Sequence, residues 1–217
     1  MLIDGPKAHA RATVVLAHGA GAPMDTPYMT TIAAGLAAAH LRVVRFEFAY
    51  MARRREDGKR RGPDRMPVLL QRWTEVLDGL DALGPMDAPV FIGGKSMGGR
   101  SAAIYAADPD NQDRISGVVC LGYPFHPPGK PEKTRLEPLR DAVKPTLILH
   151  GERDPFGKPD EVASYRIEPP VQVRWILDGD HSFVPRKRSG YTEDQTLDLA
   201  VTAVTDFVSD VLIGSRA

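Results

Sequence analysis

The chain of 217 residues is poor in cysteine and contains only Cys120. A single thiol excludes an internal disulfide framework and a cysteine-based zinc site. Because Cys120 stands in the apolar run 118–121, we expect it to be buried and unreactive.

The chain also lacks an excess of charge of either sign, since 28 Lys+Arg residues balance 28 Asp+Glu residues. Domains that bind nucleic acid through their overall charge are usually basic, so we expect no nucleic-acid partner. Hydrophobic residues make up 42% of the chain and charged residues 26%. This ordinary globular composition excludes bulk disorder, and the length favours one domain that spans residues 1–217.

Long hydrophobic runs are absent as well. No apolar stretch approaches the roughly 18 residues that a membrane-spanning helix needs. The beginning of the sequence, MLIDGPK, lacks the apolar block of a secretory signal. We therefore expect a cytoplasmic, reducing setting and no membrane contact, while the oligomeric state, including a homodimer, stays open.

Short β-rich runs alternate with helical patterns along the chain. Buried strands are predicted at 13–17, 43–46, 89–92, 115–121, 146–149 and 171–177, and helices at 28–40, 68–83, 97–107 and 197–213. The alternation predicts an α/β fold with a mostly parallel sheet of about six or seven strands and helices on both faces. In such sheets, functional groups gather at the carboxyl ends of the strands.

A nucleophile motif follows the predicted strand at 89–92. The sequence GKSMGG at 94–99 places G-x-S-x-G between a strand and a helix. The glycines remove side chains that would collide in so tight a turn, and the helix N-terminus favours a developing oxyanion. We expect Ser96 to be the nucleophile of this elbow and the Met97 N–H to be one oxyanion donor.

A phosphate loop, G-x-x-x-x-G-K-[ST], is the alternative interpretation of Gly94, Lys95 and Ser96. That motif requires glycine at position 89, where this chain has Pro89. It also requires a loop at 90–93, where the sequence predicts a strand. We therefore favour the serine nucleophile.

A serine nucleophile needs a positioned base, and the chain has six histidines. His181 lies in the loop between the last predicted strand and the C-terminal helix, at the same sheet edge as Ser96, and is the expected general base. Of the other five, His9 and His40 are expected in solvent. His18 and His150 are expected to form hydrogen bonds beside the site. His126 lies in a loop after a strand.

The acid that orients the base is predicted at Asp154, directly after the strand at 146–149. The order Ser96, Asp154, His181 along the chain is that of α/β-hydrolases. Glu152 is the alternative acid, because it follows the same strand.

An oxyanion loop is predicted at 18–22, where the sequence HGAGA follows the first buried strand. Small residues allow the backbone to approach a substrate closely. We expect the Ala20 N–H to act with the Met97 N–H, and keep the Gly21 N–H as an alternative. The expected substrate contacts are His18, Gly19, Gly21, Lys95 and His126.

The segment 52–67 is polar, and six of its residues within 53–61 are basic. We expect a solvated loop from Arg53 to Arg61. A charged rim for anionic substrates, or a surface for nucleic acid or protein, are the alternatives.

Taken together, the motifs resemble the α/β-hydrolase superfamily. The resemblance is strongest to a small branch of predicted hydrolases that includes testis-expressed-protein-like and histone-acetyltransferase-complex-subunit-like members, and extends to dienelactone hydrolases. The strings that carry it lie at 16–22, 45–51, 93–99, 121–131 and 151–157. The resemblance implies a Ser-His-Asp hydrolase with Ser96, Asp154 and His181 at the matching positions. Some relatives lack triad members, which implies an idle scaffold that binds a partner as the alternative function.

Two departures from larger hydrolases bear on the substrate. The first buried strand begins by residue 13, so the usual leading strands are reduced or absent, and the region 121–145 leaves little room for a lid. We therefore expect an open site for small or medium acyl esters or thioesters. The reaction would pass through a covalent acyl-enzyme and needs no metal or organic cofactor.

Overall fold

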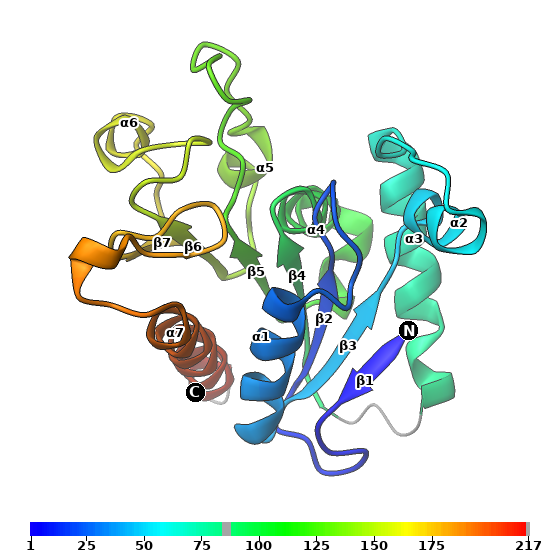
Figure 1. Ribbon diagram of the computed structural model, residues 1–217. Coiled ribbons are helices and arrows are strands. Elements are labelled where there is room, and N and C mark those ends of the chain that lie inside the picture. The colour runs from blue at the N-terminus through cyan, green and yellow to red at the C-terminus, as the bar shows by residue number, and fades with distance from the viewer. Residues whose placement is uncertain (84–87, 216–217) are drawn as a thin grey trace.

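The computed structural model describes residues 1–83 and 88–215, and its centre is one twisted sheet (Figure 1). Its strands are β1 (Leu2–Asp4), β2 (Thr13–Ala17), β3 (Arg42–Phe46), β4 (Val90–Lys95), β5 (Gly117–Leu121), β6 (Thr146–Gly151) and β7 (Val171–Ile176). The seven strands lie in the order β1-β3-β2-β4-β5-β6-β7. Only β1 runs antiparallel to its neighbour, so the expected mostly parallel sheet is confirmed.

Helices cover both faces of the sheet. They are α1 (Pro27–Ala38), α2 (Ala49–Asp57), α3 (Met66–Asp78), α4 (Met97–Ala107), α5 (Glu137–Arg140), α6 (Pro159–Ser164) and α7 (Glu193–Gly214). α1 and α7 lie side by side on one face, and α3 and α4 pack together on the other (Figure 1).

The side chains of each central strand alternate between two separate hydrophobic cores, one on each face of the sheet. In β2, Val15 and Ala17 point to the core under α3 and α4, whereas Val14 and Leu16 point to the core under α1 and α7. Successive side chains of a strand face opposite sides, so a strand covered on both faces must be apolar throughout. This is why the strands are continuous apolar runs in the sequence.

The basic segment is partly a helix, so the predicted loop at 52–67 is wrong over its first part. α2 spans 49–57 and ends at Gly58, which adopts φ 69° as a left-handed C-cap. Tyr50 and Met51 are 1% and 2% exposed and anchor the first turn in the core. The arginines that follow lie on the outer surface of this short helix and hide its apolar pattern in the sequence.

The two expected departures from larger hydrolases are visible in the fold. Ahead of β2 the chain has only the three-residue strand β1. Between β5 and β6 it has only the four-residue helix α5. No described helix combines the length and the apolar character that crossing a bilayer requires.

Candidate active site

The turn between β4 and α4 holds Ser96 in a strained backbone conformation. Ser96 has φ 53° and ψ −112°, which a non-glycine residue adopts only when its surroundings enforce it. Its N–H donates to the Leu121 carbonyl over 2.9 Å, so the adjacent strand fixes the turn. Such strain is typical of a functional side chain presented at the edge of a sheet.

Close packing explains the glycines of this elbow. A Cβ added at Gly98 would lie 2.6 Å from the carbonyl oxygen of Ala17 and 2.7 Å from that of His18. Gly94 has φ 155° and also packs directly on Ala17. Because β2 approaches α4 through backbone atoms alone, only glycine fits, as the sequence predicts.

A buried carboxylate and an imidazole meet at the ends of β6 and β7. His181 Nδ1 lies 2.7 Å from Asp154 Oδ2, and since a carboxylate only accepts, Nδ1 carries the proton. The other Asp154 oxygen accepts the N–H of Phe156 over 2.9 Å. Burial raises the pKa of Asp154, but these hydrogen bonds and the neighbouring histidines outweigh it and hold the pKa below its ordinary value. Asp154 is therefore ionised at neutral pH, and His181 Nε2 is left to accept a proton.

His150 and Glu152 are both engaged away from the imidazole of His181. His150 Nε2 donates to the Gly157 carbonyl over 2.9 Å and lies 3.6 Å from Asp154 Oδ2. Burial lowers the pKa of His150 to about 4, so this ring is neutral and packs beside the acid. Glu152 accepts the backbone N–H of Asp178 over 2.8 Å, so the alternative acid has a structural partner.

One cavity of about 380 Å³ is lined by both Ser96 and His181. It is lined mainly by small and apolar residues: Gly19, Ala20, Gly21, Ala22, Pro23, Thr26, Tyr28, Met29, Lys95, Ser96, Phe156, His181 and Ser182. The Phe156 ring packs on the His181 imidazole, with 4.4 Å between ring centroids. No described hydrogen bond joins Ser96 Oγ to His181. Free enzymes often hold this contact long and shorten it when substrate binds.

Lys95 connects the nucleophile strand to the histidine loop. It is 9% exposed, and its ammonium donates to the His181 carbonyl. It also faces the rings of Tyr28 and Phe183, 5.1 and 5.5 Å from the ring centroids. Burial lowers the pKa of Lys95 to about 8, and among the described residues no carboxylate forms an ion pair with it. Lys95 therefore lines the cavity, while its ammonium group is hydrogen-bonded to the backbone of the His181 loop.

The predicted oxyanion loop contributes residues 19–22 to the lining of the cavity. His18 does not line it. It is fully buried, with Nδ1 donating to the Gly19 carbonyl over 2.6 Å and Nε2 accepting the Phe48 N–H over 3.2 Å. The structure therefore does not bring His18 to the cavity at which its contact with substrate was expected, because both ring nitrogens are used inside the protein. Its neutral state is favoured, since burial lowers its pKa.

His126 does not line the cavity either, so the structure does not place it where its contact with substrate was expected. It is 4% exposed, and its Nδ1 lies 2.8 Å from the Pro127 carbonyl oxygen. Its Nε2 lies 3.0 Å from Glu161 Oε1, because the loop after β5 folds against α6.

Met97 is the first residue of α4, and the first amides of a helix have no hydrogen-bond partner within the helix, so the Met97 N–H could serve as the expected oxyanion donor.

Tyr50 contacts the loop at 18–22 from outside the cavity, and the sequence analysis did not single it out. Its hydroxyl donates to the Ala20 carbonyl over 2.9 Å and to the Gly19 carbonyl over 3.3 Å. Two features of the sequence could have indicated Tyr50. It is an aromatic residue between an apolar strand and a basic segment, and it lies within 45–51, one of the segments that resemble the family.

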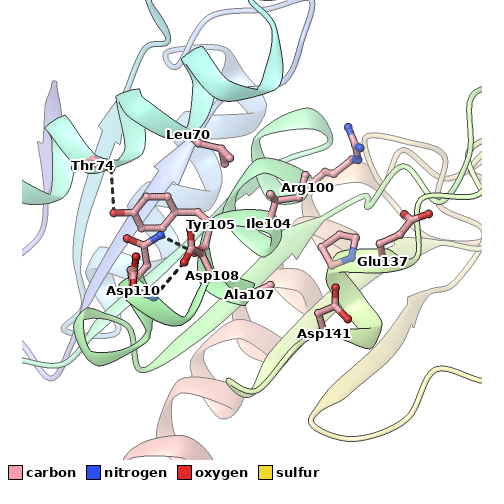
Figure 2. Close-up of a pocket in the computed structure, with 12 residues that line it drawn as sticks. Leu70, Thr74, Arg100, Ile104, Tyr105, Ala107, Asp108, Asp110, Glu137 and Asp141 are labelled. Atoms are coloured by element: carbon pink, nitrogen blue, oxygen red, sulfur yellow. Dashed lines mark hydrogen bonds between the residues drawn. The ribbon is translucent and has the colours of Figure 1, made fainter.

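A larger cavity, of about 660 Å³, lies between α3, α4 and α5 and contains none of the proposed catalytic groups (Figure 2). Thr74 and Tyr105 meet at one end, where the threonine hydroxyl donates to Tyr105 Oη over 3.3 Å. Volume alone therefore does not identify the reactive site. Within residues 1–83 and 88–215, no group of three or more His, Cys, Asp and Glu side chains could hold a metal ion.

Comparisons with known proteins identify the family and the fold. A family profile described as an alpha/beta hydrolase domain matches residues 10–209. The structure is similar to Est1E from Butyrivibrio proteoclasticus, with a TM-score of 0.72, 16% identity, and 97% of this chain and 93% of that chain covered. It is similar to XC6422 from Xanthomonas campestris, described as an α/β serine hydrolase without a lid, with a TM-score of 0.69, 16% identity, and 96% and 87% covered. It is also similar to a dienelactone hydrolase from Anabaena variabilis, with a TM-score of 0.68, 20% identity, and 96% and 89% covered. At these identities the likeness shows the fold.

Proposed function

The chain belongs to the alpha/beta hydrolase family, and from this premise we propose that it is a serine hydrolase that cleaves small or medium acyl ester or thioester bonds. The observation that carries the proposal is the hydrogen bond between buried Asp154 and His181, at a cavity that Ser96 also lines. A nucleophile, a base and an orienting acid at one cavity are the parts that acyl transfer needs.

In the proposed mechanism, Ser96 Oγ attacks the substrate carbonyl carbon while His181 Nε2 takes the hydroxyl proton. Asp154 stabilises the imidazolium that forms. Backbone N–H groups of Ala20 and Met97 hold the negative charge on the carbonyl oxygen. The tetrahedral intermediate then expels the alcohol or thiol, which leaves with the proton from His181. A water molecule, deprotonated by His181, attacks the acyl-enzyme, and His181 returns that proton to Ser96 Oγ as the acid leaves.

The shape of the cavity supports a substrate of modest size. Small residues of the oxyanion loop form one wall, and Met29 and Phe156 provide apolar surface for an acyl chain. The short connection between β5 and β6 leaves the cavity without a lid domain. We therefore propose short and medium acyl groups, with the leaving group directed to solvent.

The test is hydrolysis of p-nitrophenyl esters of increasing chain length by the wild type and by Ser96→Ala. We expect Ser96→Ala to lower kcat by about 10⁶-fold, by analogy with other triads. Ser164→Ala, which changes an exposed serine on α6, is the matched control and should leave kcat unchanged. Equal rates for Ser96→Ala and the wild type would refute the nucleophile, and a folded wild type that hydrolyses no ester would favour the idle scaffold.

A further inference from the structure

Three consecutive carbonyl groups of the oxyanion loop are held from one side by α2. Tyr50 Oη donates to the carbonyls of Ala20 and Gly19, over 2.9 and 3.3 Å. Arg54 Nη1 donates to the next carbonyl, that of Gly21, over 3.2 Å. The loop therefore turns a row of carbonyl oxygens toward α2.

The opposite edge of the same peptides carries the amides. In a trans peptide the C=O and the following N–H point in opposite directions, so the N–H groups of Ala20 and Gly21 point away from Tyr50. Residues 19–22 line the cavity beside Ser96, and no described hydrogen bond uses either of these two N–H groups. Successive free amides on one side of a turn form a concave site for an anion.

Tyr50 is a rigid anchor for this arrangement. Its side chain is 1% exposed, and its ring meets the His18 imidazole edge-on, with 5.7 Å between centroids. Its own backbone N–H donates to Asp64 Oδ2 over 3.0 Å, which fixes the first turn of α2. Burial raises the pKa of Tyr50 far above its ordinary value, so the hydroxyl stays a donor in neutral and mildly alkaline solution.

We propose that Tyr50 is a positioning residue of the oxyanion hole: its hydroxyl holds the Gly19 and Ala20 carbonyls so that the amides on the other side of these peptides, Ala20 N–H and next to it Gly21 N–H, face the reacting carbonyl oxygen together with the Met97 N–H. The inference rests on the proposed function. Arg54 supports the same loop from the next turn of α2, at its exposed end. The basic segment thereby has a role in the site through one contact, that of Arg54 with the Gly21 carbonyl.

The experiment compares Tyr50→Phe with the wild type on a p-nitrophenyl ester and on its thiono analogue, in which sulfur replaces the carbonyl oxygen. Sulfur is a poor hydrogen-bond acceptor, so the ester-to-thionoester ratio of kcat/KM reports on the oxyanion hole and is insensitive to general loss of structure. Phenylalanine keeps the ring packing against His18 and removes only the hydroxyl. Tyr105→Phe, which removes a buried hydroxyl in the cavity of Figure 2, is the matched control.

For Tyr50→Phe we expect kcat on the ester to fall roughly tenfold to hundredfold, KM to change less than about twofold, and the ester-to-thionoester ratio to fall with kcat. Tyr105→Phe should keep both the rate and the ratio. An unchanged ratio in Tyr50→Phe, with or without loss of rate, overturns the positioning role while the hydrolase function stands. A wild type that hydrolyses neither ester, and carries no acyl group on Ser96, overturns the proposed function and this inference with it.

Discussion

The proposed nucleophile elbow at 94–99 and the proposed oxyanion loop at 18–22 both contribute residues to the lining of one cavity but are held in different ways. The elbow is fixed by backbone atoms in close contact, with Gly94 and Gly98 packed against β2. The oxyanion loop is fixed by side chains, chiefly Tyr50 and His18, and an added Cβ at Gly21 meets no atom within 4 Å. The elbow should therefore be sensitive to side-chain size, and the loop to the loss of hydrogen-bond donors.

The largest effect on stability is expected from Gly98→Ala. Its new Cβ would overlap two backbone carbonyls, and backbone cannot move aside as a side chain can. We expect the free energy of unfolding to fall by about 3 kcal/mol, and the melting temperature by about 10 °C. Chemical denaturation followed by circular dichroism measures this. A loss no larger than that from Gly21→Ala would remove the distinction between the two regions.

Lys95→Met tests a long side chain that links the elbow to the His181 loop. The pKa of Lys95 is 10.5 in the unfolded chain, and burial lowers this pKa to about 8 in the folded protein. Between these values the unfolded state binds more protons, so the free energy of unfolding of the wild type rises with pH. Lys95→Met has no ammonium group at this position, so its free energy of unfolding does not rise with pH for this reason. We expect the wild type to gain about 3 kcal/mol relative to Lys95→Met from pH 7 to 10.5.

The measurement is urea denaturation of both proteins at several pH values. Lys187→Met, at an exposed lysine, is the control and should show a constant difference from the wild type. A constant difference for Lys95→Met as well would mean that the ammonium is not buried as described. Removal of the contact with the His181 carbonyl should also lower kcat, which the same preparations can report.

The smallest effect is expected from Gly21→Ala. Its position is open, and its φ lies outside the left-handed region, so an alanine fits without strain. We expect the free energy of unfolding to change by less than about 0.5 kcal/mol. A loss of several times this value would show that packing, rather than the contacts with Tyr50 and Arg54, determines the loop.

Much of this arrangement follows from the sequence for a simple reason. Buried parallel strands are continuous apolar runs, and their carboxyl ends lie at one edge of the sheet, so Ser96, Asp154 and His181 could be placed at one rim. Only Asp154 and His181 are joined by a described hydrogen bond, and the catalytic roles remain proposals. The named branch of predicted hydrolases likewise stays a prediction.

What the sequence could not supply is the direction of side chains in loops. His18 and His126 stand next to the expected site along the chain, but each uses its ring nitrogens inside the protein. The sequence did not predict α2, because its only buried residues are Tyr50 and Met51, which precede a run of arginines. Such orientations depend on contacts between residues far apart in sequence, and no periodic pattern records them.

The most direct test of the central claim is the site of reaction with a fluorophosphonate probe, which forms a covalent adduct only with an activated serine. The native protein should carry one adduct, located by peptide mass spectrometry on Ser96. The adduct should be absent after denaturation and in His181→Ala, since the hydroxyl is reactive only beside a positioned base. An adduct on another residue, or none on folded wild-type protein, would contradict the account.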